Sequence, residues 1–267
     1  MVRVSVAKFG EVPQSSVDRV LKILNDCYRI IGEPQAELVE LFIFKESEAR
    51  AFFATHDALS GKPRISIYLD HLLSLPEIVS LAGLRRQAAH SVLHGSLESY
   101  LIPFPESLLQ AIKQYQLPLE YAHKLLQAAA MASKEYRVTE LLYEKGFVED
   151  QAAYAKYILE LGEEEILAWE IASRNKLEKI LHLSSILRDI SCAVPLLRNA
   201  TSGEEIRESL AGKLSHLPPE YQIKIKGILS RAFPPPQPDL LRSIDLLIRE
   251  ISRELLGYEL NTWPSED

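Results

Sequence analysis

The chain has 267 residues, 47% of them hydrophobic and 25% charged, which is typical of a globular protein and excludes a largely disordered one. Its formal net charge of −7, with lysine and arginine scattered along the chain, argues against a nucleic-acid binder, which needs a basic surface. Two cysteines are too few for a disulfide framework or a four-cysteine zinc site. Cys27 follows apolar residues at helical spacing, so we expect it to be buried.

Targeting and membrane signals are weak in this sequence. The longest apolar runs, such as residues 38–44, are far too short to cross a bilayer. Residues 1–8 alternate polar and apolar side chains and lack the apolar block of a signal peptide. The sequence therefore predicts a cytoplasmic protein without a membrane partner.

The N-terminal part is predicted to mix strands and helices. Alternating valines predict a half-buried strand at residues 2–6, and apolar residues at helical spacing predict a helix at 15–31. Residues 38–44 are predicted to form a more central strand, and a short helix follows at 48–55. Residues 64–69 alternate again, as expected of an edge-like strand.

From Pro76 onward the pattern predicts helices alone. A long helix is expected from Glu77 to about Tyr100, ended by Pro103 and Pro105. Further helices are predicted at 119–131, 133–145, 149–161, 163–173, 176–192, 203–215 and 219–232.

The C-terminal end has a different composition. The proline-rich run at 233–238 predicts a stiff linker before a last amphipathic helix, and 261–267 a loose tail. Overall, the sequence predicts an α+β fold. A small α/β part with a short sheet spans residues 1–115, and an all-helical part spans 116–267.

The most chemically pointed feature is the histidine pair His90-Ser-Val-Leu-His94. Four residues on an α-helix turn by about 40° and rise by about 6 Å, so both rings leave one face. Two imidazoles at this spacing can share one metal ion, which is why the spacing recurs in zinc sites. The alternative is a pair of hydrogen-bonded histidines without metal. The other histidines, His56 among them, have no partner at such a spacing.

The order strand, helix, strand, edge-like strand and His-x-x-x-His helix, followed by a helical part, resembles the zincin metallopeptidases over residues 1–145. Those enzymes carry His-Glu-x-x-His, in which the histidines bind zinc and the glutamate is the general base. The resemblance implies that His90 and His94 are metal ligands. Ser91 stands at the position of the base and cannot take that role. Glu98 is expected to be an acceptor for the His94 ring or a surface residue, and it is also the candidate replacement as catalytic base.

A catalytic zinc needs a third protein ligand. In one zincin branch that ligand is a glutamate on a later helix, and the resemblance makes Glu135 and Glu140 the candidates here. Glu135 is preferred because Tyr136 or Arg137 beside it would hold its carboxylate. A solvated surface glutamate is the alternative for either residue.

These features lead to one functional expectation and one alternative. We expect a zincin-like protein that binds one divalent metal, most simply zinc, through His90, His94 and Glu135. It would be either a non-standard metal-dependent peptidase or amide hydrolase, or a degenerate pseudoenzyme that binds peptides. The alternative is a metal-free helical interaction protein that offers a groove to a partner helix. The sequence leaves the oligomeric state open.

Overall fold

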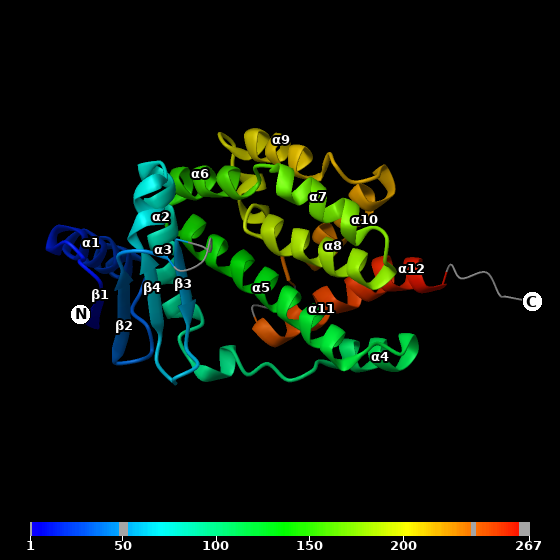
Figure 1. Ribbon diagram of the computed structural model, residues 1–267, viewed down its shortest axis with the longest axis horizontal. Coiled ribbons are helices and arrows are strands. Elements are labelled where there is room, and N and C mark those ends of the chain that lie inside the picture. The colour runs from blue at the N-terminus through cyan, green and yellow to red at the C-terminus, as the bar shows by residue number, and fades with distance from the viewer. Residues whose placement is uncertain (1, 48–52, 236–238, 262–267) are drawn as a thin grey trace, which may run out of the picture. The chain divides into compact units, whose positions relative to one another are not determined.

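The computed structural model describes residues 2–47, 53–235 and 239–261. Helices dominate, and a four-stranded mixed sheet forms from the N-terminal part of the chain (Figure 1). The predicted α+β class is confirmed. Every described element after the fourth strand is a helix, so the predicted helical C-terminal part is confirmed as well. No described helix is both long enough and apolar enough to cross a bilayer.

The chain divides into two compact units that differ from the expected division at residue 115. Unit 1 comprises Met1–Ile102 and Arg137–Tyr157, and unit 2 comprises Pro103–Tyr136 and Ile158–Asp267. The long helix α5, Leu119–Glu144, contributes to both, because it belongs to unit 2 up to Tyr136 and to unit 1 afterwards. A segment in the middle of the chain therefore completes the N-terminal unit.

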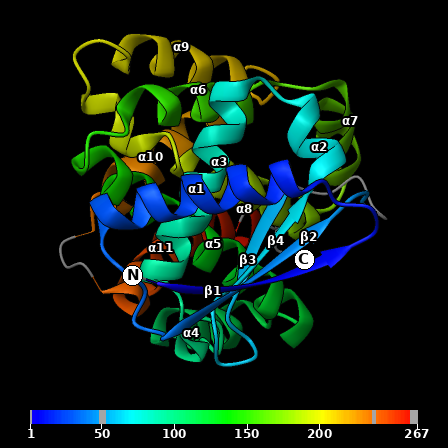
Figure 2. The same cartoon turned by 90° about the vertical axis from the view of Figure 1, so that its left-hand side faces the viewer.

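The sheet of unit 1 has three parallel strands and one antiparallel edge strand, in the order β1-β2-β4-β3 (Figure 2). The strands are β1 Arg3–Phe9, β2 Leu38–Phe44, β3 Ala54–Asp57 and β4 Arg64–Tyr68. The three predicted strands are thus confirmed. The prediction that residues 64–69 form an edge strand was wrong, because β4 pairs with β2 on one side and with β3 on the other.

Strand β3 was not predicted. The sequence favoured a short helix at 48–55; residues 48–52 lie outside the described part, and Ala54 and Thr55 belong to β3. The hairpin between β3 and β4 turns through Gly61, whose φ of 79° is costly for other residues. The hairpin places β3 at the open edge of the sheet.

One face of the sheet is covered by two helices, α1 Gln14–Ile31 and α3 Glu77–Leu93, which lie beside each other (Figure 2). The alternating residues Val39, Leu41 and Ile43 of β2 are fully buried on this face. Cys27 of α1 is buried in the same core, as predicted, and burial raises the pKa of its thiol to about 12. Full burial of a large apolar side chain, such as that of Leu41 or Ile43, stabilises the fold by about 1.5–3 kcal/mol.

Helix α3 ends earlier than predicted. It stops at Leu93 rather than near Tyr100, and His94 is its C-cap residue with φ −134° and ψ 26°. The reason is Gly95, where a Cβ would lie 2.2 Å from the Ser91 carbonyl oxygen and 2.9 Å from Pro63 Cγ. Only glycine lets the chain leave the helix so close to its own last turn.

Elsewhere the helices follow the predicted pattern with two kinds of change: the helices at Leu69–Ser74 and Glu106–Tyr115 were not predicted, and two predicted helices are one. The helices expected at 119–131 and 133–145 are the single helix α5. Of the predicted linker, Phe233 is buried and stacks on Tyr136 at 4.6 Å, while 236–238 lie outside the described residues, as does the predicted tail from 262. The remaining helices are α2 Leu69–Ser74, α4 Glu106–Tyr115, α6 Val148–Ile158, α7 Glu163–Ala172, α8 Lys176–Ser191, α9 Gly203–Leu214, α10 Pro219–Ala232, α11 Leu240–Ile251 and α12 Gly257–Asn261, with shorter turns at Leu97–Ser99, Val194–Arg198 and Ser252–Leu256.

Candidate metal centre

The predicted histidine pair lies at the C-terminal end of α3. His94 is fully buried, and His90 is 7% exposed. The N–H of His94 donates to the His90 carbonyl at 2.7 Å, so the last helical turn is kept although His94 is a cap. Their ring centroids are 5.7 Å apart with planes tilted by 51°. The two imidazoles are therefore neighbouring side chains with almost no solvent exposure.

A third histidine, His56, joins this pair from β3. Strand β3 runs antiparallel to β4, and its register sets His56 opposite Ile65. Because the inward side of β4 carries Ile65, the pleat directs His56 towards the face covered by α3. Its ring stacks on His90 with centroids 5.8 Å apart and planes 18° apart. We call His56, His90 and His94 the histidine cluster.

The His56 ring is held by Tyr100, which follows the short turn Leu97–Ser99. The Tyr100 hydroxyl is 2.6 Å from His56 Nδ1 and donates to the His56 carbonyl oxygen at 3.2 Å. A carbonyl only accepts, so when the hydroxyl proton points to it, the Nδ1–H donates to the tyrosine oxygen. In this tautomer the other ring nitrogen, Nε2, carries the lone pair that binds metals.

Ser91, which stands at the position of the family's general base, does not belong to the cluster. It is fully buried, and its hydroxyl donates to the Ala88 carbonyl at 2.7 Å. Its oxygen then accepts from the Tyr28 hydroxyl of α1 at 2.7 Å. The side chain therefore ties α1 to α3 and is a packing residue in this structure.

The predicted carboxylates lie in different places. Glu98 is exposed in the turn Leu97–Ser99, and hydrogen bonds from its own backbone N–H and from Ser96 lower the pKa of its carboxyl. Glu135 is half-buried on the part of α5 that belongs to unit 2, and Glu140 is half-buried on the part that belongs to unit 1. The role of Glu98 as a base and of Glu135 as a ligand both stay predictions.

Two arginines fix α3 within unit 1. Arg86 is 2% exposed and donates to Thr139 at 2.7 Å and to Gln151 at 3.0 Å. Arg85 forms an ion pair with Asp150 at 2.8 Å; burial raises the pKa of that carboxyl and the arginine opposes the rise. Because these buried groups are paired, removing one would be costly. They hold the helix that carries two of the three histidines.

The donor set of the histidine cluster suits zinc. Imidazole nitrogen is a common zinc ligand, and three histidines with one open position form a known type of catalytic zinc site. No three histidine, cysteine, aspartate or glutamate side chains among the described residues already converge on one point as metal ligands. The rings of the histidine cluster are adjacent, but they would need to rotate to share an ion.

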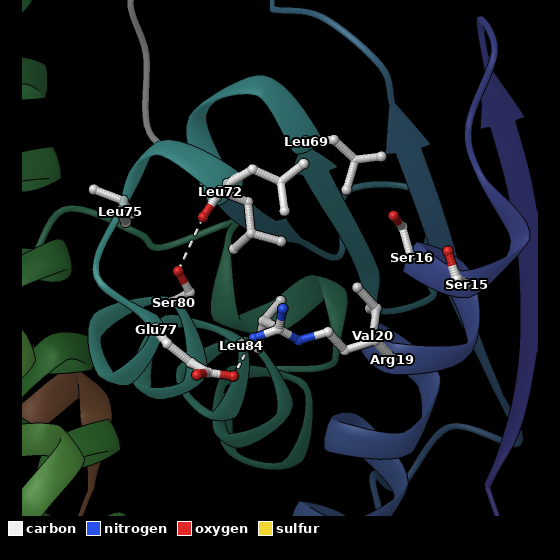
Figure 3. Close-up of a pocket in the computed structure, with 11 residues that line it drawn as sticks. Ser15, Ser16, Arg19, Val20, Leu69, Leu72, Leu75, Glu77, Ser80 and Leu84 are labelled. Atoms are coloured by element: carbon white, nitrogen blue, oxygen red, sulfur yellow. Dashed lines mark hydrogen bonds and ion pairs between the residues drawn. The ribbon is translucent and has the colours of Figure 1, made fainter.

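A separate pocket lies at the other end of α3. It has a volume of about 400 Å³ and is lined by the start of α1, by α2 and by the start of α3 (Figure 3). Arg19 and Glu77 form an exposed ion pair at 2.8 Å beside it, and Ser80 donates to the Leu72 carbonyl at 2.9 Å. Glu77 precedes His90 by thirteen residues, roughly 20 Å of helix, so the pocket is distinct from the histidine cluster.

No protein-family model, no curated protein and no solved structure matches the chain.

The sequence alone missed His56. Ala54 and His56 alternate with Thr55 and Asp57, and a turn with Gly61 follows before the next alternating strand. This pattern is typical of a β-hairpin, and it could have revealed strand β3 from the sequence. Without the strand, His56 has no visible relation to a helix that begins 21 residues later.

Proposed function

We propose that the chain is a zincin-like protein that binds one zinc ion through His90 and His94. The observation that carries the proposal is the adjacency of two buried imidazoles, 5.7 Å apart at the end of α3. The element order β1, α1, β2, β3 and β4, followed by the short helix α2 and the histidine helix α3, also supports the resemblance to zincins. Glu135 is the predicted third ligand.

The residues around the pair bear on the chemistry. A bound zinc polarises a carbonyl and lowers the pKa of a coordinated water to about 7. The hydroxyl of Ser91 is engaged with Tyr28 and Ala88, so it offers no base, and Glu98 remains the predicted one. We therefore favour a peptide-binding protein with weak or no general peptidase activity over an efficient hydrolase. The protein would act in the cytoplasm, without nucleic acid.

The proposal is tested by zinc titration of the chain after a chelator has removed any bound metal and dialysis has removed the chelator. The wild type should bind one zinc per chain, and His90→Ala and His94→Ala should each remove most of that binding. His71→Ala is the matched control, since His71 lies in the same unit on α2 with a partly exposed ring beside Asp70. A wild-type chain that takes up no zinc, or equal losses in all three variants, would overturn the proposal.

The same titration separates the proposal from a metal-free helical interaction protein. That alternative requires no stoichiometric ion in the wild type. It also expects the His90→Ala and His94→Ala chains to keep every property of the wild type except the stability lost with two buried side chains.

A further inference from the structure

We infer that His56 supplies a third imidazole ligand to the ion, with Tyr100 as the residue that orients it; this inference rests on the proposed function. The zincin resemblance assigns no ligand to a strand, and the sequence pattern gave His56 no partner. The assignment comes from the position, the spacing and the hydrogen bonds of the ring.

The position follows from the sheet. Strand β3 is the edge strand, and within it the pleat directs Ala54 and His56 to the side that faces α3. Ala54 is buried there, whereas Thr55 on the opposite side is exposed. His56 therefore approaches the end of α3 from the strand side while His90 and His94 approach from the helix. Ligands that come from two different elements can surround an ion, which two neighbours on one helix cannot do alone.

The spacing suits a shared ion. Two imidazoles bound to one tetrahedral zinc at about 2.0–2.1 Å have ring centroids about 5 Å apart. In the structure the centroid distances are 5.8 Å between His56 and His90 and 5.7 Å between His90 and His94. His90 is thus the central ring, and both spacings are within about 1 Å of the liganded value. No three such groups already converge among the described residues, so the three rings would have to rotate about their side-chain bonds to share one ion.

The hydrogen bonds of His56 orient its ring for metal binding. A histidine that ligates a metal usually donates its other ring N–H to an oxygen, which fixes the tautomer and the orientation of the ring. The Tyr100 hydroxyl lies 2.6 Å from His56 Nδ1 and 3.2 Å from the His56 carbonyl oxygen, so it can accept such a bond from an Nδ1–H while it donates to the carbonyl. Coordination is thereby directed to Nε2.

The residues of the proposed site differ in how deeply they are buried. His94 is fully buried, whereas His56 and Tyr100 are partly exposed. His56 Nε2 is itself buried, so the three rings would hold an ion inside the protein, with the partly exposed residues on the side of β3. With the three imidazoles as the protein ligands, the fourth coordination position would admit water, and Glu135 would then not be a ligand.

The experiment measures zinc affinity by competition with a chelator in the full chain. The variants are His56→Ala, His56→Asn and Tyr100→Phe, with His71→Ala as the control. We expect His56→Ala and His56→Asn to weaken zinc binding by more than about 100-fold and Tyr100→Phe by about 10–100-fold. Denaturant unfolding of each metal-free variant checks that the fold is kept. Cobalt bound in place of zinc should change its visible spectrum in the His56 variants and not in the control.

The outcomes separate this inference from the proposed function. A wild type that binds no zinc overturns both. If His90→Ala loses zinc while both His56 variants keep wild-type affinity and the wild-type cobalt spectrum, the inference about His56 alone is overturned. If Glu135→Gln then loses zinc in place of the His56 variants, the third ligand is the predicted carboxylate.

Discussion

The structure changes the roles that the sequence suggests for two residues: Ser91 is a packing residue, and His56 lies beside the histidine pair. Ser91 stands in the histidine motif, yet its hydroxyl lies at the contact of α1 with α3, between Tyr28 and Ala88. His56 lies 34 residues before the motif, yet its ring stacks on His90. Sequence spacing finds groups on one helix, such as His90 and His94. It does not find groups that a strand pairing brings together, because that register is set by the whole sheet.

The first prediction concerns Ser91. Ser91→Ala should lower the free energy of unfolding by about 1–3 kcal/mol, because the Tyr28 hydroxyl loses a buried acceptor. Ser91→Glu should cost more, since a carboxylate enters a fully buried position. Denaturant unfolding of the metal-free chains measures both changes. Ser91→Ala should keep zinc binding, because the side chain is not in the histidine cluster.

A different result for Ser91→Glu would revise this account. If the glutamate is accommodated without loss of stability and the variant gains hydrolysis of unstructured peptides, position 91 faces the metal as in the resembling family. The packing role of the serine would then be wrong.

At the scale of elements, the packing of α3 depends on a glycine in its interior. Gly83 lies under the ring of Phe53, and a Cβ there would be 2.1 Å from Phe53 Cζ. Gly212 in the last turn of α9 has no atom within 4 Å of such a Cβ. The two glycines have the same helix propensity and opposite surroundings, so they form a matched pair.

The second prediction uses that pair. Gly212→Ala should raise the free energy of unfolding by about 0.5–1 kcal/mol, because alanine loses less backbone entropy in a helix. Gly83→Ala should lower it by about 1–3 kcal/mol, because the methyl group displaces the Phe53 ring. Thermal and denaturant unfolding give both values. A stabilised Gly83→Ala chain would mean that Phe53 does not pack on α3.

The errors at this scale have physical causes. The end of α3 was predicted at the prolines Pro103 and Pro105, but close packing of Gly95 against Pro63 stops it earlier. Such a tertiary contact leaves no periodic signal. The helix α5 was divided at residue 132, although the alanines around that position favour continuation. The long, strongly periodic helices and the strands with alternating or continuous apolar residues were predicted correctly, because burial of one face determines them locally.

At the scale of the whole molecule, unit 2 contains a second histidine pair that no metal hypothesis uses. His182 of α8 and His216 lie with ring centroids 6.3 Å apart, and Trp169 of α7 packs on His182 at 5.8 Å. The Nε2 atoms of both histidines are buried and accept or donate no hydrogen bond within the described structure. Burial is the main cause that lowers the pKa of each ring, and for His182 the neighbouring His216 adds to it.

The third prediction follows from these lowered pKa values. In the unfolded chain the rings titrate near pH 6.5, and in the folded chain they take up protons only at lower pH. The unfolded state therefore binds more protons between these values, and stability rises with pH there. The contribution is complete above about pH 6.5 and is lost as the pH falls below that value.

Melting temperatures measured from pH 7 to pH 5 test this dependence. The wild type should lose stability on acidification, and His182→Gln should reduce the slope, while His123→Gln, at an exposed position of unit 2, should leave it unchanged. Equal slopes in the wild type and His182→Gln would show that the buried pair does not titrate on unfolding.

The central claim is that the chain holds one zinc at the end of α3, and its metal content tests it most directly. Protein purified without chelator is dialysed and analysed for metal and for protein concentration in the same sample. We predict close to one zinc per chain in the wild type and close to none in the double variant His90→Ala/His94→Ala. A folded wild-type chain that contains no metal, even after incubation with zinc, would contradict the account.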